Sequence, residues 1–433
     1  MTESCRWKTR SAIVRSGKCG NRAMDGHAIY FVGAGLPRAL QQPDFPVPLM
    51  WDFVSVAASY AATDDVLLTT LTQLEIGGVF EHSTPQSIAL AAKVAPPSTA
   101  TAAERAEFLQ AISSRRPENI EQLLIRASEL AKAPTKVVLD RTTLKLLPLR
   151  FSFAINRVFA HIGWSFSASP LRRFLGGELH TFERATFVSF NYDLMLEHGI
   201  EDVAPDAWCA TTGYGTAFEE FVEADEGNKH LRRRGSGGQG SLRSHTTTRA
   251  SSGRIVVLKP HGSLNWLCRF ADNYAFVGYP THLVLSVDER VAYLGGNNVE
   301  LLERPNGWPW PNAGVFISPP TQKTPLPTIL TQEEEAIVDA DDVLIIGWSA
   351  PATDEDQVAL IKRAIARRRR PFRRVTLIEW NPARFQVRRM RELFAPSTTF
   401  TLWVGGFQTY ATHTPLTWLS SRLRWWALRR AWS

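Results

Sequence analysis

The chain contains few cysteines and none that are paired in the sequence. Its 433 residues include four, Cys5, Cys19, Cys209 and Cys268, and no two of them form a Cys-x-x-Cys motif. This spacing argues against a disulfide framework and against a thiolate zinc site. We therefore expect no structural zinc and no metal cofactor.

Long apolar runs are also missing. No segment approaches the roughly 18 consecutive apolar residues that a membrane-spanning helix needs. The amino-terminal sequence MTESCRWKTRSAIVRSGK lacks the apolar core of a secretory signal. The composition, 44% hydrophobic and 21% charged, is ordinary for a folded soluble protein. We predict a cytoplasmic protein without a transmembrane segment.

The basic residues do not predict a nucleic-acid surface, although the formal net charge is +7. Much of the excess lies in two runs, Arg232–Arg234 and Arg367–Arg370. The second run ends a helical pattern, where cations interact favourably with the helix dipole. The first lies in residues 227–253, which are rich in Gly, Ser, Arg and Thr and predict a flexible loop. No aromatic residues alternate with these arginines, so an RNA base would find no stacking platform.

Four strand-like segments end in glycine or polar residues. Their first halves are rich in the β-branched and aromatic residues of buried strands. The segments are AIYFVGAG (28–35), TFVSFNYD (186–193), IVVLKPHGS (255–263) and VLIIGWSAPATD (343–354). In open α/β sheets, ligands bind at the carboxyl ends of the strands. We therefore predict an α/β fold: a Rossmann-like parallel sheet with helices on both faces and a helical insertion.

The first of these ends has the chemistry of a phosphate-binding turn. Glycines at positions 33 and 35 let the backbone approach a pyrophosphate, and a helix after them would direct its free N–H groups at that charge. Pro37 suits the first position of such a helix. The third glycine of the dehydrogenase fingerprint is missing, which argues against a hydride-transfer enzyme.

The next two ends carry side chains that suit catalysis. Asn191 offers one acceptor and two donors, and the imidazole of His261 can accept or donate a proton. Taken alone, Asn191 or Asp193 can be a helix cap, and a lone histidine is more often structural. The presence of several polar strand ends in one chain favours the functional interpretation.

The ordered set GAG, NYD, HGS and GWS resembles the sirtuin-like NAD-binding fold. The resemblance is closest to its bacterial sirtuin-like NADase branch, in which antiviral defence effectors are prominent, and it covers the sheet-forming segments. It implies that NAD is the substrate and is cleaved to nicotinamide and ADP-ribose, with Asn191 and His261 as the catalytic residues. Protein-deacylating sirtuins carry a zinc module with paired cysteines, whose absence here disfavours deacylation.

The resemblance also implies which residues bind the nucleotide. The turn after the first strand and the GWS segment would hold the pyrophosphate and ribose, Asp193 the nicotinamide amide or the developing positive charge, and Asn381 the adenine. The implied binding residues are Gly33, Ala34, Gly35, Asp193, Gly347, Ser349 and Asn381. Where the family has a serine close behind the glycine turn, this chain has Pro37, with Arg38 as a substitute phosphate ligand. This difference keeps open a sensor that binds NAD or ADP-ribose without cleaving it.

Composition and periodicity divide the chain into four parts. The predicted parts are an extension (1–27), a Rossmann NAD-binding domain (28–60 and 181–405), a helical insertion (61–180) and a basic aromatic helix (406–433). In the insertion, Ile120, Leu123 and Leu124 fall on one face of a helix, whereas Glu121 and Glu129 are predicted to face solvent. In the last part, Trp418, Trp425 and Trp432 recur every seven residues.

An NADase in the cytoplasm would be toxic unless it were restrained. We therefore expect a homo-oligomer whose activity is controlled by assembly, by a protein partner or by a nucleotide activator.

Overall fold

The computed structural model describes residues 26–132, 144–162, 168–224, 231–233, 254–269, 282–284, 313–317, 326–412 and 421–430, apart from a few positions within these ranges. The predicted extension lies outside the described residues except for Gly26 and His27. Most of the predicted loop 227–253 lies outside them as well. Within the part of the chain that is described, no helix is both long and apolar enough to cross a bilayer.

Six parallel strands form the central sheet, in the order β11-β10-β9-β1-β2-β5. They are β1 (His27–Val32), β2 (Arg184–Ser189), β5 (Ile255–Leu258), β9 (Asp342–Ile346), β10 (Arg374–Glu379) and β11 (Phe400–Val404). All four segments predicted from their polar ends lie in this sheet, and the predicted Rossmann-like parallel fold is confirmed. The strand order reverses between β1 and β9, which is the switch point where such sheets bind ligands.

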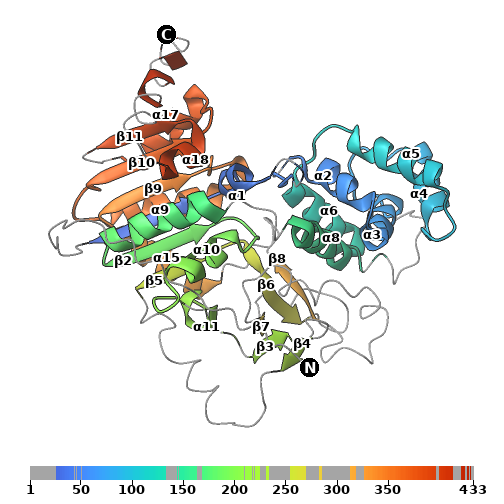
Figure 1. Ribbon diagram of the computed structural model, residues 1–433, viewed down its shortest axis with the longest axis horizontal. Coiled ribbons are helices and arrows are strands. Elements are labelled where there is room, and N and C mark those ends of the chain that lie inside the picture. Colours follow the sequence, from blue (N-terminus) through green and yellow to red (C-terminus); the bar gives the residue numbers. More distant parts are fainter. Residues whose placement is uncertain are drawn as a thin grey trace, which may run out of the picture.

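Helices cover both faces of this sheet (Figure 1). They are α1 (Gly35–Leu40), α9 (Ala168–Thr181), α10 (Met195–Val203), α11 (Ala210–Gly213), α15 (Pro327–Asp339), α16 (Glu355–Ala366), α17 (Arg384–Leu393) and α18 (Gly406–Ala411). Successive side chains of a strand point to opposite faces. On β1, the Tyr30 ring lies 6.0 Å from that of Phe174 on α9, and the next ring, Phe31, lies 5.4 Å from that of Phe394 after α17.

A separate group of helices, which we call the helical domain, is inserted between β1 and α9. It consists of α2 (Phe53–Ala61), α3 (Asp65–Ile76), α4 (Pro85–Val94), α5 (Ala102–Ser113), α6 (Ile120–Lys132) and α8 (Leu147–Ile162). These helices share their own hydrophobic cluster and lie to one side of the sheet in Figure 1. The predicted insertion also included α9, which instead packs against α10 and α18 beside the sheet.

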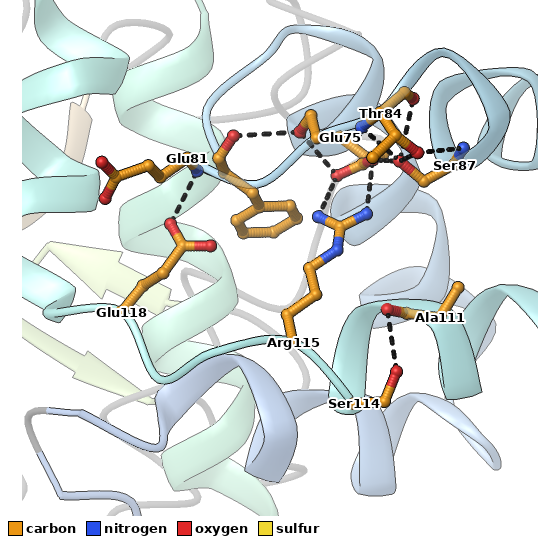
Figure 2. A network of polar contacts seen from close by, with 10 residues as sticks. Glu75, Glu81, Thr84, Ser87, Ala111, Ser114, Arg115 and Glu118 are labelled. Carbon is orange, nitrogen blue, oxygen red and sulfur yellow. Dashed lines mark hydrogen bonds and ion pairs between the residues drawn. The ribbon is translucent and has the colours of Figure 1, made fainter.

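A buried ion pair ties the helices of this domain together (Figure 2). Both guanidinium N–H₂ groups of Arg115, which follows α5, donate to the carboxylate of Glu75 on α3, at 2.7 Å each. The hydroxyl of Ser87 on α4 also donates to Glu75. A buried carboxylate is stable only when it is paired and hydrogen-bonded. These contacts therefore fix how α3, α4 and α5 meet.

A second sheet contains two strands that precede β5 in the chain and three that follow it. Its order is β4-β3-β7-β6-β8, and its strands are β3 (Glu220–Ala224), β4 (Leu231–Arg233), β6 (Gly262–Arg269), β7 (His282–Val284) and β8 (Ala313–Ile317). Three residues of the predicted loop 227–253 thus form β4, which pairs with β3. The link between β5 and β6 carries His261, so this residue lies where the chain passes from one sheet to the other.

The predicted basic aromatic helix is described only in part. Gly406–Ala411 form α18, which packs on α1 and α9. The backbone N–H of Val404 on β11 donates to the hydroxyl of Ser421 at 2.9 Å, which attaches the carboxyl-terminal part to the sheet. Trp418, Trp425 and Trp432 lie outside the described residues.

Candidate functional site

A cavity of about 320 Å³ lies at the carboxyl ends of the central strands. Its walls come from the turns after β1, β2 and β9, from the last residue of β10, from α17, from the link between β5 and β6, and from α6 and α8 of the helical domain. The predicted site residues that line it are Gly33, Ala34, Gly35, Asn191, Asp193, His261, Gly347 and Ser349. The fold therefore brings four separate strand ends, distant in sequence, to one cavity.

Asn381 does not line this cavity. The strand β10 ends at Glu379, and the next two residues are exposed, Trp380 by 67% of its surface. In place of Asn381, Glu379 lines the cavity together with Gln386 of α17, whose side-chain nitrogen donates to the Glu379 carboxylate at 3.0 Å. Burial raises the pKa of Glu379 to about 7.

The two glycine turns pack backbone against backbone at the switch point. A Cβ atom on Gly33 would lie 2.5 Å from the carbonyl oxygen of Gly347, and one on Gly35 would lie 2.6 Å from the Gly347 Cα. The Gly35 N–H donates to that same carbonyl at 3.1 Å, and the Leu36 N–H donates to the Gly33 carbonyl at 3.0 Å. The glycines are thus required by the contact between the turns, and these two N–H groups are already used.

The helix after the first turn begins two residues earlier than Pro37 predicts. The helix α1 starts at Gly35, with Ala34 as the preceding N-cap. Pro37 is therefore its third residue, and the prediction of Pro37 at the first position is wrong. Proline is tolerated there because the N–H groups of a first helical turn have no acceptor within the helix.

Asn191 connects the ends of two neighbouring strands. Its side-chain nitrogen donates to the Gly33 carbonyl oxygen at 3.1 Å, which fixes the amide beside the first glycine turn. Asp193 contributes to the start of α10, since its carboxylate accepts from the N–H of Met195 at 3.1 Å. The N-cap of α10 is Leu194, so neither Asn191 nor Asp193 is the cap residue itself, although Asp193 binds the first N–H of the helix. Burial raises the pKa of Asp193 to about 6, against the opposing effect of the Lys259 ammonium.

A fully buried lysine holds the turn that carries these two residues. The Nζ of Lys259 donates to the Glu197 carboxylate at 2.7 Å and to the Asp193 carbonyl oxygen at 2.5 Å. Glu197 lies on α10 and Lys259 directly follows β5. Because buried charges must be paired and hydrogen-bonded, this ion pair fixes the spacing between the turn after β2 and His261, two residues beyond Lys259.

The imidazole of His261 lies between two carboxylates. Its Nδ1 is 3.8 Å from Oε1 of Glu121, and its Nε2 is 3.4 Å from Oδ1 of Asp354. All three side chains are buried and line the cavity. They offer one ligand atom each within 4.8 Å of one another, a donor set of a kind that divalent cations accept. The predicted absence of a metal cofactor stays a prediction.

Two of these three residues were not predicted as site residues. Glu121 was expected to face solvent, but only 2% of its surface is exposed. The first turn of α6 both packs in the helical domain and lines the cavity. Asp354 is the N-cap residue of α16, but its side chain makes no capping hydrogen bond to that helix. Its carboxylate instead accepts from the indole N–H of Trp348 at 2.9 Å. The sequence feature that could have identified Asp354 as a site residue is its position five residues after Ser349, at the end of the GWS segment.

The cavity wall is rich in acidic groups. Glu121, Asp193, Asp354 and Glu379 line it together with His261, and the described lining residues include no lysine or arginine. The pKa values of Asp193 and Glu379 are both raised, so these two groups carry a partial charge near neutral pH. This wall favours a cationic or hydrogen-bonding group over an anionic one.

Comparison of the chain with protein-family models and with curated protein sequences found no match.

Proposed function

We propose that the chain is a sirtuin-like NAD glycohydrolase, which cleaves the N-glycosidic bond of NAD and releases nicotinamide and ADP-ribose. The observation that supports this proposal is that Asn191 and His261 line one cavity beside the paired glycine turns of a parallel sheet. Such a switch point is the usual nucleotide-binding position in this class of fold.

The cleavage passes through a transition state that resembles an oxocarbenium ion. A site for it must hold the ribose, oppose the positive charge and direct water to the anomeric carbon. Asn191 is held by its hydrogen bond to Gly33, so its amide can orient a ribose hydroxyl or the attacking water. His261 can accept a proton from that water or hydroxyl. Asp193 and Asp354, both buried at the cavity, would oppose the charge on the sugar.

The pyrophosphate would be bound mainly by neutral groups. Ser349 lines the cavity and offers a hydroxyl, whereas the N–H groups of Gly35 and Leu36 in the turn after β1 are bonded to carbonyl oxygens of the two glycine turns. Arg38, which we expected to replace the family's serine, is not among the lining residues. Its guanidinium donates to the Val47 carbonyl oxygen at 2.6 Å and lies 3.6 Å from the Asp52 carboxylate. We therefore propose that Arg38 holds the loop that contains Val47 and does not bind phosphate.

The test is to incubate the purified protein with NAD and to separate nicotinamide and ADP-ribose by chromatography. We expect product from the wild type and a loss of at least about 100-fold in Asn191→Ala and His261→Ala, the scale of a lost general base or positioning group. His180→Ala, which removes an exposed histidine on α9, is the matched control and should retain full activity.

The same experiment separates the competing functions. A wild type that binds NAD by calorimetry but releases no nicotinamide, at any protein concentration and with any candidate activator, would be a sensor. Consumption of an acetyl-lysine peptide would indicate a deacylase. A wild type that neither binds nor cleaves NAD contradicts the proposal.

We further propose that the activity is restrained in the cell and belongs to antiviral defence. This part rests on the resemblance of the GAG, NYD, HGS and GWS ends to the bacterial NADase branch. Restraint by homo-oligomer assembly, by a protein partner or by a nucleotide would protect a cytoplasm that contains the enzyme. Light scattering across protein concentrations, with nicotinamide release measured in parallel, tests whether assembly and activity change together.

A further inference from the structure

Two buried polar atoms at the cavity have no hydrogen-bond partner among the described residues. They are Oε2 of Glu121 and Nε2 of His261, which lies 3.4 Å from the Asp354 carboxylate without forming a hydrogen bond to it. Both side chains are almost completely removed from solvent. Buried polar atoms without a partner are rare in folded proteins, and both residues line the cavity. These two atoms are therefore available for hydrogen bonds to a group that enters the cavity.

The charges around these two atoms are mostly negative. Glu121, Asp193 and Asp354 approach from α6, from the turn after β2 and from the segment before α16. The ammonium of the buried Lys259 is already bound to Glu197 and to two backbone carbonyl oxygens. Among the described residues that line the cavity, His261 is the only one with a basic side chain.

Flat apolar surfaces adjoin the carboxylates. Phe159 of α8, Phe190 and Tyr192 line the same cavity. Aromatic faces attract cations and pack well against planar rings. Carboxylates beside aromatic rings are thus the surroundings that suit a planar organic cation.

We propose that Glu121, His261 and Asp354 form an anionic subsite that accepts the positively charged pyridinium ring of an N-ribosyl ligand and discriminates against its neutral, reduced form. Glu121 is then a specificity-determining residue, and it is supplied by the helical domain. This inference rests on the proposed function in that NAD⁺ is taken as the ligand.

The two carboxylates are held in place by their own surroundings. The backbone N–H of Glu121 donates to Oδ1 of Asn119 at 2.8 Å, which fixes the first turn of α6. Asp354 is held by the indole N–H of Trp348. Because these contacts do not involve the carboxylate of Glu121, the change Glu121→Gln removes the charge and leaves the helix start intact.

The test compares two ligands of nearly equal shape by titration calorimetry. Carba-NAD⁺ carries the pyridinium charge and resists hydrolysis, whereas NADH has a neutral ring. We expect the wild type to bind carba-NAD⁺ more tightly. Glu121→Gln should weaken carba-NAD⁺ binding about tenfold, or about 1.4 kcal/mol, and should change NADH binding less than about twofold.

The matched control is Glu129→Gln, an exposed glutamate on the same helix. It should leave both affinities unchanged, and circular dichroism should show that both variants are folded. Equal wild-type affinities for the two ligands, or equal losses for both in Glu121→Gln, would overturn the inference. Since carba-NAD⁺ is not cleaved, a clear preference in a protein that releases no nicotinamide supports the subsite and refutes the hydrolase.

A divalent cation is the competing occupant of the same three side chains. Electron paramagnetic resonance of Mn²⁺, added to the wild type without nucleotide, measures this directly. Tight Mn²⁺ binding that Glu121→Gln abolishes would overturn the inference, because the metal would already neutralise the carboxylates. No specific Mn²⁺ binding, together with the preference for carba-NAD⁺, supports it.

Discussion

Glu333 is the acidic residue near the site whose pKa is raised the most. Burial raises its pKa to about 8, and the neighbouring Asp354 charge acts in the same direction. With its nitrogen turned toward Glu333, the Gln357 amide donates to both carboxyl oxygens, at 3.0 and 3.1 Å. Glu333 is therefore largely protonated near neutral pH, which avoids a second buried negative charge beside Asp354.

The raised pKa of Glu333 predicts a specific dependence of stability on pH. In the unfolded chain the group titrates near 4.5, so between about pH 4.5 and 8 the folded state binds more protons. The stability that depends on this proton is complete below pH 4.5 and is lost as the pH rises through 8. Denaturant titrations of the wild type and Glu333→Gln should show an advantage of the variant that grows by a few kcal/mol from pH 5 to pH 8.

The comparison between the two proteins removes the effects of all other titrating groups. A difference that stays constant across this pH range would show that Glu333 is charged in the folded protein. It would also weaken the account of how the acidic groups coexist around His261.

At the scale of elements, the site depends on the contact between the turn after β1 and the turn after β9. Gly347 has a φ of +60°, and a Cβ atom added to it would lie 2.4 Å from the Cα of Gly35. The obstacle is backbone, so it cannot rotate away. Asn191 is bonded to the same pair of turns through Gly33, and any displacement would reach it.

The change Gly347→Ala should therefore lower the free energy of unfolding by more than backbone strain alone would. Gly78, at a φ of +72°, has open space around its hypothetical Cβ, so Gly78→Ala isolates the strain, about 1–2 kcal/mol. We expect Gly347→Ala to lose clearly more than that, of order 3 kcal/mol or above, because two backbones must separate. Chemical denaturation measures both values, and equal losses would show that the turns can move apart freely.

At the scale of the whole molecule, two hydrophobic clusters meet at the cavity. The cluster of the helical domain includes Tyr192, Leu194 and Met195 next to the NYD turn, and Leu264 of β6. These residues belong to the sheet-bearing part of the chain, so the helical domain is docked on the site by apolar contacts. Glu121 reaches His261 only while this docking holds.

Truncation of one docking residue should therefore loosen the site from a distance. Leu264 is fully buried, and Leu264→Ala should cost about 2–5 kcal/mol through the cavity that it leaves. Hydrogen exchange should quicken in the first turn of α6. Leu423→Ala, at a residue that is 59% exposed, is the control and should change neither quantity. Unchanged exchange in α6 would mean that the helical domain is held by other contacts.

The sheet and most of the candidate site could be predicted from the sequence because their signals are local. Strand composition and a change to glycine or polar residues at each strand end identify Gly33, Asn191, His261 and Gly347. Parallel strands then bring these ends to one edge of the sheet, which holds for any sheet of this class. Asn381 does not line the cavity and lies in the exposed turn after β10, so its predicted contact with the adenine stays a prediction.

The sequence by itself determined that the chain forms a parallel α/β sheet with polar strand ends, and that its cysteines are not paired in sequence. Only the tertiary structure decided that Glu121 and Asp354 flank His261 and that Lys259 fixes the NYD turn. Local patterns report whether a residue lies on an apolar face, but not what approaches it from elsewhere. The docking of the helical domain on the sheet is such an approach, and it adds the Glu121 carboxylate to the site.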